Sequence, residues 1–341
     1  MRDSLLKIFN LEEKKSYAII GNSKNAGKTT VLNKIVKDIS DINKKSAVSS
    51  IGWDGEAIDR VYKTEKPAVI IPRGSFVATC KELLPINSSL FKIYEDSKIE
   101  TILGSIYIVE ALSSMKVEIV GPRDLKSTKS LIDKLKKYCD YILLDGALNR
   151  STSASSMITD GFIFSILYSG KESISEFEKN IKLFYEKYNN FEIIDKKVLN
   201  IDSSELITKN FVAIGRDKEI IFMDFQNPIQ NEEKLLKVEN KADWIYLPGA
   251  LTDITVEKLS NFFVDISIII DDWTKNFLSQ RILTILKNRN CKIYYLFNSK
   301  LVGVTISTFS YSNFIKSLPD QLISIVKSIF KNYPVVDLFY N

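Results

Sequence analysis

The chain has 341 residues, 45% of them hydrophobic and 26% charged, so it is an ordinary globular protein long enough for two domains. Its 47 lysines and arginines nearly balance 42 aspartates and glutamates, and the net charge of +5 is spread without long basic blocks, which argues against a nucleic-acid partner. Histidine is absent, which excludes imidazole bases, histidine metal ligands and Ser-His-Asp triads. The remaining chemistry uses carboxylates, lysine, hydroxyls, backbone groups and oxygen-held metals.

No apolar stretch is long enough for a membrane span: the longest, residues 162–168 and 266–270, have strand length. No charged and apolar leader opens the sequence. Three cysteines are scattered without the paired spacing of a disulfide or zinc site. We therefore expect a cytoplasmic protein that does not bind a membrane.

The first predicted element is a strand at 17–20, which leads into a glycine-rich turn and then a helix. This order is typical of a phosphate-binding loop (P-loop), where backbone N–H groups and the helix dipole face the β-phosphate. Lys28 is expected to reach the β- and γ-phosphates and act in catalysis, and the Thr29 hydroxyl to ligate Mg²⁺. The residues expected to bind the nucleotide are Gly21, Asn22, Asn25, Ala26, Gly27, Lys28, Thr29 and Thr30.

The loop departs from the strict P-loop pattern at one position. Asn22 occupies the place of the first glycine, and Gly21 comes one residue early. Because asparagine tolerates positive φ better than most residues, we expect Asn22 to make the turn. The alternative is that Gly21 and Gly27 merely bracket a tight strand-to-helix turn.

Alternating strands and helices follow and predict a mostly parallel, doubly wound α/β sheet. The expected helices are 31–39, 127–138 and one opening at 151–157. The expected strands are 46–51, 68–71, 106–109, 117–120, 141–145 and 162–168.

Two carboxylates follow predicted strands and belong at the same edge as the loop. Asp145 ends the buried strand 141–145, where it is expected to hold Mg²⁺ directly or through water. Asp54 follows strand 46–51 and is a catalytic candidate that could order the attacking water or bind metal-bound water. For Asp54 a turn or helix start explains the sequence about as well.

The second half predicts another α/β domain. A hairpin is expected from strands 211–215 and 219–224 around Arg216-Asp217-Lys218. Further strands are expected at 244–247, 264–270, 292–297, 302–306 and 335–338. We place a nucleotide-binding domain at 1–175 and a second domain at 176–341. The second lacks a Lys-Thr loop, so we expect it to recognise a partner and to bind no nucleotide.

Five segments, taken in order, resemble a known family. They are residues 21–33, 50–56 (SIGWDGE), 117–123 (VEIVGPR), 145–150 (DGALNR) and 247–253 (LPGALTD). Together they resemble the reactivase-type P-loop subunit associated with adenosylcobalamin-dependent lysine 5,6-aminomutase, and the resemblance extends over nearly the whole chain. The loop alone marks only the broad superfamily of deviant-loop ATPases and GTPases.

The resemblance implies a chaperone-like ATPase that uses ATP and Mg²⁺ to reactivate a B12-dependent aminomutase, together with a second reactivase subunit. Damaged cobalamin would leave the mutase during ATP hydrolysis. Carried over to this sequence, Lys28 and Thr29 match the phosphate and Mg²⁺ positions, and Asp145 matches the distal metal carboxylate. The oligomeric state stays open, and a homodimer is among the alternatives.

Two other functions remain as alternatives. One is an ATP-dependent ligase or kinase of the dethiobiotin synthetase type, for which Arg73 and Arg123 are the available substrate-binding charges. The other is a GTP-binding protein for cofactor insertion, such as insertion of a molybdopterin cofactor. The Asn/Thr-Lys-x-Asp element expected for guanine is not evident after strand 162–168, which favours ATP.

Overall fold

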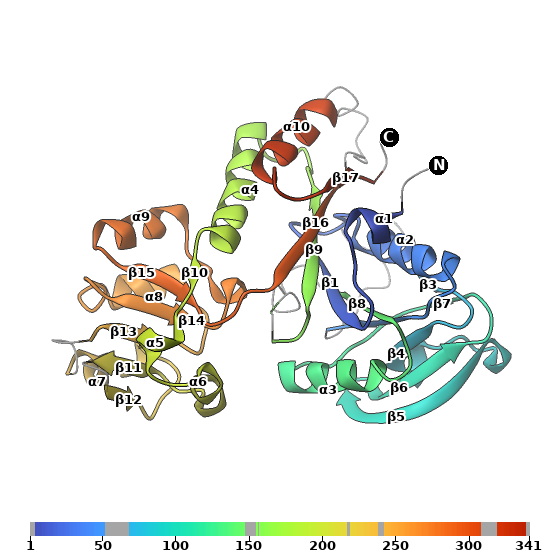
Figure 1. The fold of residues 1–341 in the computed structure, drawn as a ribbon, viewed down its shortest axis with the longest axis horizontal. Coiled ribbons are helices and arrows are strands. Elements are labelled where there is room, and N and C mark those ends of the chain that lie inside the picture. Colours follow the sequence, from blue (N-terminus) through green and yellow to red (C-terminus); the bar gives the residue numbers. More distant parts are fainter. Residues whose placement is uncertain are drawn as a thin grey trace. The chain divides into compact units, whose positions relative to one another are not determined.

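The computed structural model describes residues 4–51, 68–146, 155, 157–216, 219–237, 242–307 and 319–338. The chain forms two compact units (Figure 1). The first unit combines residues 1–178 with 299–341, and the second comprises 179–298. Each unit contains its own sheet.

The first unit is built, within its described residues, on a nine-stranded sheet of order β17-β16-β9-β1-β8-β2-β4-β6-β5. Neighbouring strands from β17 to β4 are parallel, and β6 and β5 extend the sheet in antiparallel fashion. The strands are β1 Lys15–Gly21, β2 Ser46–Ser50, β4 Phe76–Cys80, β5 Phe91–Thr101, β6 Gly104–Ala111, β8 Tyr141–Asp145, β9 Gly161–Leu167, β16 Lys300–Ser307 and β17 Val335–Asp337. The predicted α/β class with a mostly parallel sheet is therefore confirmed.

Helices cover both faces of this sheet. Helices α1 (Leu5–Ile8) and α2 (Lys28–Asp41) pack on the face that contains Leu143 of β8. Helix α3 (Leu125–Leu135) packs on the face that contains Ile142 and Leu144. Successive residues of a strand point to opposite faces, and both faces of β8 are covered, so Tyr141 to Leu144 are all buried and only Asp145 at the strand end is charged. The doubly wound arrangement follows from this.

The last part of the chain returns to the first sheet. β16 pairs in parallel with β9, helix α10 (Pro319–Ile329) follows, and β17 pairs with β16. Phe164 of β9 and Phe330 contact each other with ring centroids 6.1 Å apart. The expected domain boundary near 175 is close to the observed one, but residues 299–341 belong to the first unit, not to the second. Sequence order could not reveal this, because the pairing of β16 with β9 joins strands more than 130 residues apart.

The predicted strand 68–71 forms, whereas of the predicted strand 117–120 only Val117 lies in a strand, and both lie outside the main sheet. β3 (Val69–Ile71) and β7 (Met115–Val117) pair with each other in a separate two-stranded sheet. Strands β4 and β5 were not predicted; β5 alternates charged and apolar residues like a surface segment. β5 is attached to α3 through Glu95, which accepts hydrogen bonds from Lys134 Nζ (2.6 Å) and the Tyr138 hydroxyl (2.8 Å).

The second unit contains a six-stranded sheet, within its described residues, of order β10-β15-β14-β13-β11-β12. The predicted hairpin is confirmed as the antiparallel pair β11–β12. The strands of this sheet are β10 Glu192–Ile193, β11 Ala213–Arg216, β12 Glu219–Phe222, β13 Trp244–Tyr246, β14 Ser267–Ile270 and β15 Lys292–Tyr295. The accompanying helices are α5 Lys196–Leu199, α6 Ser203–Lys209, α7 Glu232–Leu236, α8 Asp253–Lys258 and α9 Gln280–Asn288. Helix α4 (Ile174–Asn189) begins in the first unit and continues into the second.

Among the helices of the described residues, none combines the length and apolar character that crossing a membrane requires.

Candidate functional site

The loop of residues 22–27 joins the end of β1 to the start of α2. Its left-handed residues are Asn25, with φ of 62°, and Gly27, with φ of 84°. Gly27 is the N-cap residue of the 14-residue helix α2, and without a side chain it cannot cap the first N–H groups of the helix. Together with the helix dipole, these N–H groups form an arrangement suited to an anion.

Asn22 anchors the loop to the neighbouring strand β9. Its backbone N–H donates to the Ser165 carbonyl (3.1 Å), its Nδ2 donates to the Leu167 carbonyl (3.0 Å), and its Oδ1 accepts from the Leu167 N–H (2.8 Å). The expectation that Asn22 supplies positive φ is wrong, because Asn25 and Gly27 do so. An asparagine side chain offers a donor and an acceptor that glycine lacks, and both are used here.

A Cβ would be tightly placed at Gly21, the last residue of β1, and would clash at Gly27 of the loop. A Cβ on Gly21 would lie 3.0 Å from the Ala26 Cβ and 3.2 Å from the Ser165 carbonyl. A Cβ on Gly27 would lie 2.7 Å from Leu338 Cδ1, and its positive φ adds strain. Leu338 directly follows β17, so the C-terminal part of the chain packs against the loop.

Lys28 lies along the inner side of the loop. Its Nζ donates to the Ser23 carbonyl at 3.4 Å, and its Cδ would lie 3.4 Å from a Cβ on Gly21. The ammonium is therefore held over the loop backbone, the position from which it can meet a phosphate. Thr29 and Thr30 are partly exposed in the first turn of α2.

Asp145 lies beside this loop because β8 and β1 are adjacent. In the parallel register Asp145 is opposite Ile19 of β1 and Ser50 of β2. The Ser50 hydroxyl donates to the Asp145 carbonyl (3.0 Å), the Gly146 N–H donates to the Ile19 carbonyl (3.0 Å), and the carboxylate Oδ1 is shielded from solvent. The sheet thus brings the carboxylate to the same edge as Lys28 and Thr29, as the sequence predicted.

The Thr29 hydroxyl and the Asp145 carboxylate are hard oxygen donors, the type that Mg²⁺ prefers. Among the described residues, no group of three or more acidic or cysteine side chains gathers around a common point. A cation held by these two oxygens would take its remaining ligands from elsewhere, such as water or a bound phosphate.

Some predicted features lie outside the described residues: Asp54, the second of the two predicted carboxylates, and most of the helix expected at 151–157. The catalytic role of Asp54 stays a prediction.

Sequence reasoning missed the polar support behind the loop. Ser165 and Thr305 are fully buried in β9 and β16, and Thr305 Oγ1 donates to Ser165 Oγ at 2.9 Å. A serine in the apolar run 161–167 was a signal for this role, because buried hydroxyls need partners.

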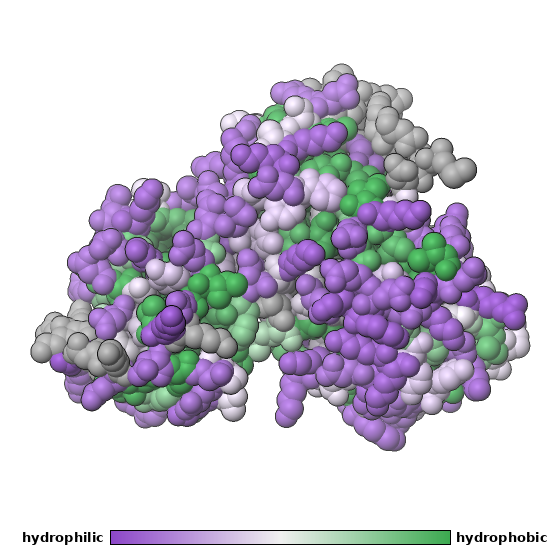
Figure 2. Space-filling view, viewed as in Figure 1, coloured by the Kyte–Doolittle hydropathy of each residue, from purple (hydrophilic) through white to green (hydrophobic). Residues whose placement is uncertain are grey.

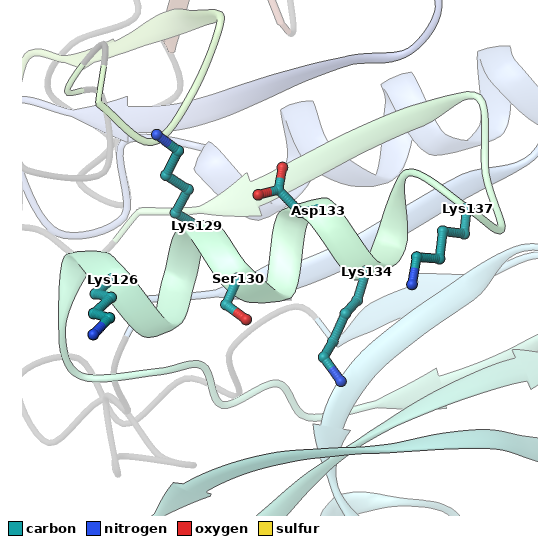
Figure 3. A pocket seen from close by; sticks show the side chains of 6 residues that line it. All are labelled: Lys126, Lys129, Ser130, Asp133, Lys134 and Lys137. Carbon is teal, nitrogen blue, oxygen red and sulfur yellow. The ribbon is translucent and has the colours of Figure 1, made fainter.

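A shallow groove follows the outer face of α3 (Figure 3). Lys134, one of its lining residues, is paired with Glu95. The residues that line the groove are Lys126, Lys129, Ser130, Asp133, Lys134 and Lys137. On the visible side of the first unit the surface over α3 is largely hydrophilic (Figure 2). Lys126 and Lys129 lie near the start of α3, whereas Lys137 lies beyond its end.

The second unit contains a buried polar cluster at the ends of β13 and β14. The Tyr246 hydroxyl donates to Asp271 Oδ1 at 2.7 Å. Burial raises the pKa of the Asp271 carboxyl to about 6 and also raises the pKa of Tyr246. Asp272 accepts the backbone N–H of Thr274 at 2.9 Å and caps the following turn. These hydrogen bonds are internal, so the cluster has the character of a structural support.

Comparisons with protein-family models, with curated proteins and with solved structures gave no match. The family resemblance therefore stays a prediction, and the functional argument depends on the geometry of the site.

Proposed function

We propose that this protein belongs to the P-loop class and binds MgATP at the loop of residues 22–27. The observation that carries the proposal is the combination of an uncapped helix N-terminus, Lys28 over the loop, and Asp145 on the adjacent strand. The helix and Lys28 would bind the phosphates, and Thr29 with Asp145 would hold Mg²⁺. A lone glycine turn would need neither the lysine nor the neighbouring carboxylate.

The proposed activity is slow hydrolysis of ATP. Phosphoryl transfer depends mainly on positioning and on electrostatic stabilisation, both of which lysine, Mg²⁺ and backbone N–H groups supply without histidine. Binding and loss of the γ-phosphate would change the contacts at the edge of the sheet that holds Lys28 and Asp145. Such a cycle gives a partner-binding surface two states.

The proposed client is a B12-dependent aminomutase, acting together with a second reactivase subunit. This part of the proposal is supported by the five sequence segments that resemble the reactivase family. In that role hydrolysis would be coupled to the exchange of damaged cobalamin on the mutase.

The test is to measure binding of ATP, ADP and GTP with Mg²⁺, and then phosphate release with and without an aminomutase. We expect ATP binding and slow turnover that the mutase accelerates. Turnover started by a small carboxylate or amine would favour the ligase or kinase instead, and preference for GTP would favour the cofactor-insertion protein. If no nucleotide binds, the proposal is wrong.

A further inference from the structure

The segment of residues 118–123 crosses the carboxyl edge of the nine-stranded sheet. Thr79, near the end of β4, donates its hydroxyl to the Glu118 carbonyl (3.1 Å) and accepts the Val120 N–H (3.2 Å). Farther along, a Cβ on Gly121 would lie only 1.5 Å from the carbonyl oxygen of Ser50, the last residue of β2. The segment therefore passes first over β4 and then over β2, in the direction of β8.

Gly121 makes this crossing possible. Its backbone approaches that of Ser50 so closely that any side chain would have to displace the segment. Ser50 in turn donates its hydroxyl to the carbonyl of Asp145. Asp145, the predicted metal ligand, is on β8, the strand next to β2, and neighbouring strands of a sheet lie about 5 Å apart.

Arg123 is the next charged residue on this path, and the backbone on both sides of it is fixed. Pro122 before it is buried. After it, Asp124 caps α3 by accepting the Ser127 N–H (2.8 Å), and its carbonyl accepts the Thr128 hydroxyl (2.8 Å). The Arg123 side chain itself is exposed. Two residues span at most about 7 Å, so Arg123 stays close to the strand ends that Gly121 contacts.

A nucleoside triphosphate with Mg²⁺ keeps net negative charge, and Asp145 adds another, so a cation besides Lys28 would stabilise the terminal phosphate. We propose that Arg123 donates its guanidinium to the terminal phosphate of the nucleotide and is a catalytic residue of this site. The inference rests on the proposed function. Arginine suits the task because its planar group stays charged and donates two parallel hydrogen bonds to phosphate oxygens.

The lysines of the first turns of α3 also favour binding of a phosphate group. Lys126 and Lys129 are exposed and follow Arg123 at the start of the helix (Figure 3). They raise the positive potential on the side from which Arg123 approaches. Asp124, the acidic neighbour, is engaged as the helix cap, and the Ser127 N–H lowers the pKa of its carboxyl.

Arg73 provides a matched control within the same unit. It is also exposed, but it lies in the turn before β4. Because β4 runs parallel to β2, the start of β4 lies at the opposite edge of the sheet from Ser50 and Asp145. The neighbouring Gly74 N–H donates to the carbonyl of Ala111, at the end of antiparallel β6. Arg73 therefore does not reach the loop. The ligase or kinase alternative names it, with Arg123, as a substrate-binding charge.

The experiment measures steady-state phosphate release and equilibrium binding of ATP and ADP for the full chain and for Arg123→Ala, Arg123→Lys and Arg73→Ala. For Arg123→Ala we expect kcat to fall on the order of 100-fold and ATP affinity about tenfold, with ADP affinity unchanged. Arg123→Lys should recover part of kcat, and Arg73→Ala should match the wild type. Thermal unfolding of each variant checks that the fold is retained.

The outcomes separate the two proposals. Wild-type kcat and an unchanged ratio of ATP to ADP affinity in Arg123→Ala would overturn the role of Arg123 while nucleotide binding stands. An equal loss for ATP and ADP would also overturn it, because the terminal phosphate would not be what Arg123 contacts. If the wild type binds neither nucleotide, both proposals are wrong.

Discussion

Each of the two units contains an apolar strand that is followed or ended by an aspartate, yet the two carboxylates have different surroundings. Asp145 ends β8 next to β1, at the edge where the loop, Lys28 and Thr29 meet. Asp271 follows β14, is 7% exposed, and accepts the hydroxyl of Tyr246. The same local pattern thus gives a candidate metal ligand in one unit and a buried structural acid in the other. The neighbouring strands make the difference.

Substitution of Lys28 should have the largest effect, because among the described residues the first unit alone has a lysine over such a loop. We expect Lys28→Ala to lower ATP affinity on the order of 100-fold, since a charged contact to the phosphates is lost. Titration with a fluorescent ATP analogue measures this. Lys37→Ala, an exposed lysine on the same helix, is the control and should bind normally. Unchanged affinity in Lys28→Ala would contradict the site assignment.

The two aspartates can be compared by the same isosteric change. Asp145→Asn should raise the Mg²⁺ concentration needed for half-maximal ATP hydrolysis by about tenfold or more, because a carboxylate ligand becomes a neutral amide. Asp271→Asn should leave the Mg²⁺ requirement unchanged. Equal Mg²⁺ dependence of Asp145→Asn and the wild type would remove Asp145 from the metal site.

Asp271 should instead affect the pH dependence of stability. The folded-state pKa of Asp271, about 6, lies above the ordinary value of 3.8, so the fold favours the protonated acid. Its contribution is therefore fully present below about pH 4 and is lost as pH rises through about 6, by about 3 kcal/mol. Asp271→Asn should flatten this dependence in thermal unfolding between pH 4 and 7. Equal slopes in the mutant and the wild type would show that Asp271 does not titrate in this range.

The smallest effect is expected at Asn22. Asn22→Gly restores the usual P-loop residue but removes two side-chain hydrogen bonds to Leu167, so it should cost about 1–2 kcal/mol of stability. Differential scanning calorimetry measures the change. Asn22→Ala is the control, because it removes the same hydrogen bonds without the added backbone freedom of glycine. Gains in stability from both substitutions would contradict the anchoring role.

Local pattern predicted much of the first unit. The buried strands β1, β8 and β9, the helix α2 and the glycines of the loop all follow from apolar runs and turn residues. The sequence did not predict β5, whose exposed, charged residues belong to an edge strand, or the attachment of β5 to α3 through Glu95. It also placed the C-terminal strands in the wrong unit.

What the sequence by itself determined is the order of strand, loop and helix at residues 15–41, and the types of residue that a phosphate and Mg²⁺ would need. Only the tertiary structure decided which distant residues meet there. Parallel pairing aligned Asp145 and Ser50 with β1, the return of β16 and β17 brought Leu338 against Gly27, and the crossing at Gly121 carried Arg123 to the same edge. Such pairings depend on strand register and close backbone packing, which are properties of the folded chain and not of any one segment.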